Sequence, residues 1–341
     1  YRAHFLLSLR KSYLNNTELV DFLLSNDGDQ IMPIGNRIDF FFAKANILHL
    51  NKDYQNASEC LEKANKLKLS IFPSDKDKII LDANLLSRDT LELKKNITPC
   101  YDSVIKHVFI AGMPRCGSTL IESIISTNKD IKPLGEVDYI QKIYNQSRNI
   151  PIDIKEITRN YEDLAALKSF KGSVDKQLYN YIFTGFILEF ISSPKIIFCI
   201  RNPLDNILSI YKSHFLSGNR YASSLMDCAE LYLYHFNLLN KYHAKFDNHI
   251  YKLSYEELVN NPNHEVKDLI NWLGLKWNEK YLFPNENDRV VSTASRIQVR
   301  SPINNKSIGG WKNYEDILLP IYNFFKTNNQ EIFNIIDKYT P

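Results

Sequence analysis

The pattern of apolar and polar positions divides the chain into two parts. In the first hundred residues glycine is nearly absent, and apolar residues recur at helical spacing, as in residues 18–24 and 38–50. From Val104 onward, short apolar runs alternate with helical patterns, which is typical of a parallel sheet with helices on its faces. The pattern therefore predicts an α-helical region over residues 1–100 and an α/β domain over residues 101–341.

One pair of segments in the helical region has the apolar pattern of a tetratricopeptide repeat, with residues 51–53 as its turn. The positions that fit this pattern are Phe41, Ala45, Leu48, Tyr54, Ala57, Leu61 and Ala64. A single pair cannot bury its apolar face by stacking, so it has to pack on neighbouring helices or on the α/β domain. A generic helical hairpin explains the pattern equally well.

The strongest chemical signal lies in residues 108–126, which read VFIAGMPRCGSTLIESIIS. Residues 108–111 are apolar, as a buried parallel strand requires, and helical spacing of apolar residues follows from Leu120, so a helix begins near Ser118. The loop between them has the G-x-x-x-x-G spacing of a phosphate-binding loop and is followed by Thr119.

This loop differs from that of nucleotide phosphotransferases in one position. Ser118 stands where those loops carry a lysine, and Arg115 is the only cation of the loop. Gly112 and Gly117 let the backbone approach an anion, which the helix N-terminus attracts and Arg115 can hold through two oxygens. We expect a phosphate site without ordinary ATP chemistry. The alternative is a strand-to-helix turn whose glycines serve packing.

Two further strands end in polar residues. Residues 195–200 lead into Arg201, which then lies at the carboxyl end of a strand, where open α/β sheets bind ligands. Pro203 suits the first turn of the next helix, and Ser209 follows about two turns later, so Arg201 and Ser209 together would bind a second phosphate. After a strand over residues 249–253, Tyr255 would face the same ligand or pack. A surface position is the alternative for Arg201.

The composition of the chain limits the partners and the cellular location that we expect. The 341 residues are 44% apolar and 12% aromatic, enough for a sizeable core, and a net charge of +3 gives no reason to expect nucleic acid or an anionic membrane as a partner. The five cysteines are odd in number and lack metal-ligand spacing, which favours reduced thiols and a cytoplasmic location.

The longest apolar run, residues 181–191, is too short to span a bilayer and predicts a buried helix. Because the chain begins at Tyr1 rather than Met, an upstream signal or anchor could have been removed.

Several separated motifs, in one consistent order, resemble those of the sulfotransferases that use 3'-phosphoadenosine 5'-phosphosulfate (PAPS). They are GMPRCGSTLIESI, Gly135-Glu136, Val174-Asp175-Lys176, IRNPLDNILSIY, SYEELVNNP and QVRSPINNKSIGGWKNY. The resemblance spans residues 40–314 and is closest to bacterial tetratricopeptide-repeat sulfotransferases and tyrosylprotein sulfotransferases. It implies the sulfotransferase fold, a P-loop-like parallel sheet flanked by helices.

The resemblance also implies roles for individual residues. It assigns the 5'-phosphosulfate to Arg115, Cys116, Gly117, Ser118 and Thr119. It assigns the 3'-phosphate to Arg201 and Ser209, a nucleotide contact to Tyr255, the catalytic base to Glu136 and a catalytic cation to Lys176. Lys306, as a donor-binding residue, and Ser307, as a catalytic residue, match less closely the residues that close over the donor.

These residue types suit sulfuryl transfer to a hydroxyl. A carboxylate such as Glu136 can take the acceptor proton, and Lys176 and Arg115 can stabilise the charge that develops on the bridging oxygen. The expected co-substrate is PAPS, with PAP as product, and no metal is expected. The sequence departs from the family at Cys116, usually a serine, and at residues 177–180, where relatives usually carry a proline, so the path of that loop stays open.

The acceptor is the least determined part of this interpretation. Tyrosylprotein sulfotransferases recognise acidic segments through arginines after the catalytic glutamate, whereas here only Lys142 and Arg148 lie nearby in sequence. A protein tyrosine is the leading acceptor, and a glycan or a small alcohol or phenol is the alternative. A phosphotransferase, or a non-catalytic module that binds a nucleotide or a peptide, are the competing function classes. The oligomeric state stays open.

Overall fold

The computed structural model describes residues 2–9, 14–28, 32–92, 107–147, 154–167, 169–287 and 301–339. The chain forms two compact units, each assembled from segments that are distant in sequence. The first comprises Tyr1–Lys78, Pro203–Leu231 and Gly309–Pro341, and the second comprises Ile79–Asn202 and Tyr232–Ile308. The predicted boundary near residue 100 falls outside the described residues, so the division into residues 1–100 and 101–341 remains a prediction.

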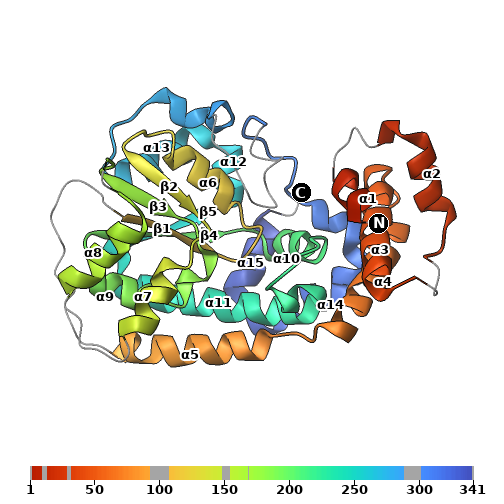
Figure 1. The fold of residues 1–341 in the computed structure, drawn as a ribbon, viewed down its shortest axis with the longest axis horizontal. Helices are drawn as coiled ribbons and strands as arrows, with labels where there is room; N and C mark the ends of the chain where they lie inside the picture. Colours follow the sequence, from red (N-terminus) through yellow and green to blue (C-terminus); the bar gives the residue numbers. More distant parts are fainter. Residues whose placement is uncertain are drawn as a thin grey trace. The chain divides into compact units, whose positions relative to one another are not determined.

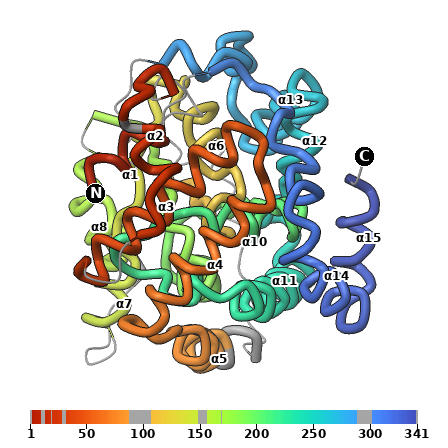
Figure 2. Tube along the Cα trace, turned by 90° about the vertical axis from the view of Figure 1, so that its right-hand side faces the viewer, coloured from red at the N-terminus to blue at the C-terminus, as the bar shows by residue number. Residues whose placement is uncertain are grey.

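The described part of the first unit is helical (Figure 1). Its elements are α1 (Arg2–Ser8), α2 (Thr17–Ser25), α3 (Ile34–Leu50), α4 (Tyr54–Ile71), α10 (Pro203–Tyr211), η3 (Arg220–Ser223), η8 (Gly310–Tyr314), α14 (Glu315–Asn328), α15 (Gln330–Lys338) and the first residues of α5 (Lys76–Glu92) and α11 (Leu225–Lys245). The C-terminal helices α14 and α15 pack on α10 (Figure 2).

Helices α3 and α4 form the predicted hairpin. They pack against each other along their length, and Asp53 caps α4 by accepting a hydrogen bond from the backbone N–H of Asn56 at 3.3 Å. Of the positions that carry the repeat-like pattern, all but Tyr54 are buried. The helical pair is therefore confirmed, and its assignment as a tetratricopeptide repeat stays a prediction.

The second unit contains a five-stranded sheet in which all neighbouring strands are parallel, in the order β2-β3-β1-β4-β5. The strands are β1 (His107–Gly112), β2 (Ile131–Gly135), β3 (Gly172–Asp175), β4 (Pro194–Ile200) and β5 (Ile250–Ser254). This confirms the predicted α/β class. The other elements are α6 (Ser118–Ile125), α7 (Tyr139–Ser147), α8 (Ile154–Leu164), α9 (Thr184–Phe190), α12 (Tyr255–Asn260), α13 (Pro262–Trp272), η2 (Leu178–Tyr181), η4 (Asp247–His249), η5 (Glu279–Leu282), η6 (Pro284–Glu286) and the remainders of α5 and α11.

Helices cover both faces of the sheet. Because alternate residues of a strand point to opposite sides, each strand contributes side chains to both faces. Phe109 of β1 and Phe198 of β4 belong to one apolar cluster, which includes residues of α7, α8, α9 and α11. Ile110 of β1 and Ile197 of β4 belong to the other, which includes residues of α6 and α13. Buried on both faces, β1 and β4 are continuously apolar, and this is why the sequence predicted them.

The order of the strands predicts where on the sheet a ligand binds. After β1 the chain crosses to β2 at one edge, returns through β3, and then passes to β4 on the other side of β1. In open parallel sheets the ligand site lies at the carboxyl ends of the strands where the connections diverge in this way. The loops after β1 and β4, which carry Arg115 and Arg201, lie at that point.

The apolar run of residues 181–191 folds as the end of η2 followed by the short helix α9. Ile187, Leu188 and Ile191 are buried in the apolar cluster that contains Phe109, so the prediction of a buried helix is confirmed over Thr184–Phe190. In the part of the chain that the structure describes, no helix combines the length and the apolar character needed to cross a membrane.

Candidate active site

The phosphate-binding loop joins β1 to α6, and the structure confirms the predicted helix start at Ser118. Gly117, the N-cap of α6, has a φ of 98°, and a Cβ there would lie 2.5 Å from the ring of Tyr255. Only glycine therefore allows this left-handed turn and the close approach of Tyr255 to the loop. Ser118 and Thr119 are buried at the first turn of the helix, where backbone N–H groups have no helical acceptor.

The backbone of Arg115 also adopts a left-handed conformation, with a φ of 67°, which costs free energy for a side chain with a Cβ. Burial, followed by the nearby positive charge of Arg201, lowers the pKa of Arg115 to about 10. Two guanidinium groups that repel each other inside the protein form a region of positive potential. An anion that binds between them would relieve this repulsion.

Arg201 lies at the carboxyl end of β4 and is nearly buried. It donates hydrogen bonds of 2.9 Å to the carbonyl oxygens of Arg115 and Ser307, and its guanidinium lies 4.9 Å from the ring centre of Tyr255. Among the described residues, no acceptor pairs with its buried Nε. A buried donor without a partner is costly, and a bound phosphate oxygen would satisfy it.

The backbone beside Arg201 is held by two buried side chains. The Tyr232 hydroxyl donates to the Arg201 carbonyl at 2.7 Å, and Glu256 accepts the N–H of Asn202 at 2.8 Å. Glu256 lies in the motif SYEELVNNP and Tyr232 in none, but the sequence assigned a role to neither residue, because their role depends on contacts between segments that are distant in sequence. These bonds fix the direction in which Arg201 leaves the sheet.

Ser209 lies in α10, which begins at Pro203 as predicted. This helix belongs to the first unit, whereas Arg201 belongs to the second. A joint phosphate contact by Arg201 and Ser209 therefore stays a prediction that rests on their sequence spacing and on the family resemblance.

Glu136 and Lys176, 40 residues apart, form an ion pair in which Nζ and Oε1 are 2.6 Å apart. The Lys176 side chain is 1% exposed and that of Glu136 is 51% exposed. Glu136 follows the last residue of β2 and Lys176 follows the last residue of β3, and the Lys176 N–H donates to the Gly135 carbonyl at 2.9 Å. Parallel pairing of β2 and β3 thus brings a solvent-accessible carboxylate to a buried ammonium.

The buried residue Asp175 holds the loop that follows β3. It accepts hydrogen bonds from the Gln177 N–H at 2.9 Å, and from the Tyr161 hydroxyl and the Asn180 side chain at 3.3 Å each. Burial raises the pKa of Asp175 to about 7. These bonds set the path of residues 177–180, which the sequence left open, into η2. The D-K pair pointed to this position, but only the structure shows what Asp175 does.

Cys116 lies beside Cys199, the partner of Gly112 in the pairing of β1 with β4. A Cβ on Gly112 would lie 2.9 Å from the Cys116 sulfur and 3.3 Å from the Cys199 Cβ. Burial raises the pKa of Cys199 well above its ordinary value, and a hydrogen bond from this protonated thiol lowers the pKa of Cys116. Cys116 therefore faces a thiol in the core, and its side chain packs behind the phosphate-binding loop.

The two weaker candidates lie in the tail segment. Ser307 contributes its backbone carbonyl to Arg201, as described above, and Lys306 is exposed, with its N–H donating to Asn304 at 3.3 Å. Ser307 thus contacts Arg201, one of the donor-side residues, through its main chain.

Comparisons with known proteins point to one family. Residues 152–279 match the family model described as the sulfotransferase family. A protein of Aquifex aeolicus (strain VF5), described as uncharacterized, is 26% identical over 367 residues, which cover 96% of this chain and 48% of that protein. The chain thus spans about half the length of that relative.

Three solved structures illustrate the similarity. The sulfotransferase domain of the Synechococcus PCC 7002 olefin synthase is 16% identical, with a TM-score of 0.47 over 64% of this chain and 91% of that one. A mouse sulfotransferase complexed with PAP is 16% identical, with a TM-score of 0.45 over 71% and 96%. A sulfotransferase from Alicyclobacillus acidocaldarius is 15% identical, with a TM-score of 0.41 over 68% and 96%.

The match of the family model includes β3, β4, α10, β5 and the segments that carry Lys176, Arg201 and Tyr255. These are three of the positions on which the resemblance of the motifs rests. Over residues 152–279 the comparison supports the family that the motifs indicated, and the chain is similar to sulfotransferases there.

Proposed function

We propose that this protein is a PAPS-dependent sulfotransferase that transfers the sulfuryl group to an acceptor hydroxyl, with a protein tyrosine as the leading acceptor. The observation that carries the proposal is the contact between Glu136 and Lys176, an accessible carboxylate held 2.6 Å from a buried ammonium at the ends of two adjacent parallel strands. The family match supports the same reaction class.

The residues around the first loop suit a donor that carries two anionic groups. The helix N-terminus with Ser118 and Thr119 offers hydrogen-bond donors to the first group, and Arg115 adds a positive charge. The buried Nε of Arg201 offers a donor to the second. PAPS has this pair of anionic groups and, when bound, supplies an activated sulfuryl group.

Each of the side chains around the site has its own role in the transfer. Glu136, the more exposed member of the pair, takes the proton from the acceptor hydroxyl. Lys176 holds the carboxylate in place and keeps a positive charge where negative charge develops during transfer, assisted by Arg115. Tyr255 lies against Gly117 and Arg201 and limits the access of water to this side of the loop.

The tyrosine acceptor follows from the resemblance to tyrosylprotein sulfotransferases. A glycan or a small alcohol or phenol uses the same base and the same donor, so it remains the alternative acceptor. In either case Glu136 has to reach a hydroxyl proton.

Calorimetric titration tests the donor assignment. We expect binding of adenosine 3',5'-bisphosphate without metal, and much weaker binding of AMP, which lacks the 3'-phosphate. Binding of ATP with Mg²⁺ alone would instead indicate a phosphotransferase. Tight binding of the bisphosphate with no transfer from PAPS to any acceptor would indicate a non-catalytic nucleotide-binding module.

A further inference from the structure

A pocket of about 600 Å³ lies in the second unit, lined by residues of α5, of α7 and of the segment that follows Lys176. Its lining residues are Asp82, Leu85, Leu86, Gln141, Tyr144, Asn145, Gln177, Tyr179, Asn180, Ile182 and Phe183. The pocket is of the size that takes a small molecule or a few residues of a peptide. None of the residues assigned to the donor lines it.

Three short segments build this pocket. From α5 come Asp82, Leu85 and Leu86, and from α7 come Gln141, Tyr144 and Asn145, in each case residues three or four apart that share one helix face. The third segment begins with Gln177, whose backbone N–H is fixed by Asp175. Ile182 and Phe183 of this segment belong to the apolar cluster that covers one face of the sheet.

The pocket is connected to the catalytic pair through the backbone. Gln177 directly follows Lys176, and α7 begins three residues after Glu136. A hydrogen bond from the Lys176 N–H to the Gly135 carbonyl ties these two segments together. The pocket lining therefore begins at the residue next to Lys176, and the helix that supplies Gln141, Tyr144 and Asn145 begins three residues after Glu136.

Half of the apolar side chains in the lining are aromatic, namely Tyr144, Tyr179 and Phe183. The rings of Tyr144 and Phe183 are 5.4 Å apart, and Tyr179 lies 6.1 Å from the buried Tyr181. These faces suit a planar ring, while the side-chain amides of Gln141 and Asn145 can both donate and accept hydrogen bonds. The chemistry of the lining therefore favours a ring that carries polar but uncharged groups.

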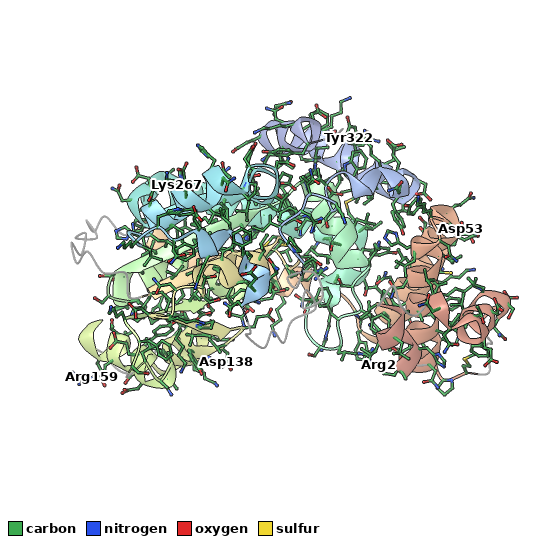
Figure 3. The ribbon with its side chains drawn as sticks, turned by 90° about the horizontal axis from the view of Figure 1, so that it is seen from above. Arg2, Asp53, Asp138, Arg159, Lys267 and Tyr322 are labelled. Atoms are coloured by element: carbon green, nitrogen blue, oxygen red, sulfur yellow. The ribbon has the colours of Figure 1, made fainter. Side chains whose placement is uncertain are left out.

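The charge of the lining also limits which ligands the pocket can bind. Among its described lining residues the one charged side chain is the exposed carboxylate of Asp82. The ammonium of Lys142, the first described cation after Glu136 in sequence, already pairs with the carboxylate of Asp138 at 2.8 Å; Asp138 is labelled in Figure 3. An acidic ligand would meet Asp82 without a matching cation among these residues.

We infer that this pocket binds the acceptor, and that the acceptor is a phenol whose surroundings are uncharged or positive rather than acidic. The inference rests on the proposed sulfotransferase function and narrows its substrate class. A tyrosyl peptide with neutral or basic flanks and a free neutral phenol share this chemistry, and the experiment separates them.

Three probes test the inference: a peptide with one tyrosine between alanine and glutamine residues, the same peptide with glutamates as flanks, and N-acetyltyrosinamide. Binding of each is measured by calorimetry with adenosine 3',5'-bisphosphate present, and sulfuryl transfer is measured with PAPS. We expect the neutral peptide or N-acetyltyrosinamide to exceed the acidic peptide by about fivefold or more in kcat/KM. A preference for N-acetyltyrosinamide over both peptides would identify a free phenol as the source.

Positive charge introduced into the lining should reduce this preference. Asp82→Lys and Asn145→Lys both change exposed side chains of the pocket and should raise turnover of the acidic peptide relative to the neutral one. The matched control is Asp268→Lys, the same change on α13, which covers the opposite face of the sheet. The control should leave the ratio unchanged.

Failure of the pocket assignment and failure of the proposed catalytic function give different results in this experiment. Preference of the unmodified protein for the acidic peptide, or a ratio that Asp82→Lys and Asn145→Lys do not change, would overturn the pocket assignment while sulfuryl transfer stands. Absence of transfer to every probe, together with binding of the bisphosphate, would overturn the proposed catalytic function and the acceptor assignment with it.

Discussion

The donor side and the acceptor side of the candidate site are built in different ways. Arg115, Gly117 and Ser118 lie within one loop between a strand and a helix, so a short run of sequence determines their geometry. The acceptor pocket combines residues from α5, α7 and η2, which are separated by tens of residues. The first region follows from local backbone chemistry, and the second depends on how the sheet and its helices pack.

The charges of the two regions differ as well. The donor side brings two guanidinium groups together, and burial with mutual repulsion lowers the pKa of Arg115 to about 10. The described lining of the pocket has amides, phenols and one carboxylate. A protein that concentrates positive charge on one side of the reacting groups can bind a highly anionic donor there and an uncharged acceptor on the other.

The Glu136→Gln variant separates binding from chemistry and should have the largest effect. Glutamine keeps the size of the side chain but cannot take a proton, so kcat should fall by about 10²- to 10⁴-fold. Affinity for adenosine 3',5'-bisphosphate, measured by calorimetry, should remain nearly unchanged because a base acts mainly in the transition state.

Asp138→Asn is the matched control for this prediction. Asp138 is an exposed carboxylate two residues beyond Glu136, and its contact is the surface pair with Lys142. We expect near-normal turnover. Unchanged turnover in Glu136→Gln would remove Glu136 from the mechanism, and equal losses in both variants would indicate a structural effect on this segment.

Arg201→Ala should weaken the donor side specifically. Loss of a charge-assisted hydrogen bond typically costs ~1.5 to 3 kcal/mol, or about 10- to 150-fold in the Kd of adenosine 3',5'-bisphosphate. AMP, which lacks the 3'-phosphate, should lose far less affinity. Calorimetry with both nucleotides measures the difference.

Two further variants sharpen the interpretation of this result. Arg201→Lys keeps the charge but loses the planar fork, so it should recover only part of the affinity. Arg220→Ala, a change of an exposed arginine, should have little effect. Equal losses for the bisphosphate and AMP in Arg201→Ala would mean that Arg201 supports the loop through the Arg115 and Ser307 carbonyls without binding the 3'-phosphate.

The same contrast explains how far the sequence could predict the fold. Residues 108–111 and 195–200 are continuously apolar because β1 and β4 are buried on both faces, so both strands were predicted within two residues. The strand β2 lies at the sheet edge and contains Pro133, whose missing N–H an edge tolerates, and β3 has only four residues. Neither has an apolar pattern that identifies it alone.

This limit matters most for the acceptor side. The family motifs named Glu136 and Lys176, but the reason that they meet is the pairing of the two strands that the pattern did not identify. The pocket could not be predicted either, since a face shared by α5 and α7 exists only after the helices have packed. Local motifs therefore predict the candidate donor site, whereas the proposed acceptor pocket depends on tertiary packing.

The variant Asp175→Asn tests whether Asp175, which holds the loop after β3, makes the stability of the protein depend on pH. Burial raises the pKa of Asp175 from 3.8 to about 7, so between these values the folded protein binds more protons than the unfolded chain. The protonated carboxyl contributes its full stability below a pH of about 4, and this contribution is lost as pH rises through 7. The slope is at most about 1.4 kcal/mol per pH unit.

Thermal unfolding of the two proteins from pH 5 to pH 8 measures this effect. The stability of the natural protein should fall relative to that of Asp175→Asn as pH rises, because asparagine does not titrate. Asp163→Asn, a change of an exposed carboxylate in α8, should leave the pH profile unaltered. A difference between Asp175→Asn and the natural protein that is constant with pH would show that Asp175 is ionised throughout this range.

Cys116→Ser should have the smallest effect and tests whether the thiol matters to the donor loop. Cys116 packs against Gly112 and Cys199 behind the loop, and serine has nearly the same size and can also accept a hydrogen bond from the Cys199 thiol. We therefore expect kcat and the affinity for adenosine 3',5'-bisphosphate to stay within about threefold of the natural values. Cys228→Ser, at a buried cysteine of the first unit, measures the general cost of such a change. Complete loss of transfer in Cys116→Ser alone would show that the loop needs the thiol itself, and the donor side would then depend on side-chain chemistry as much as on its backbone.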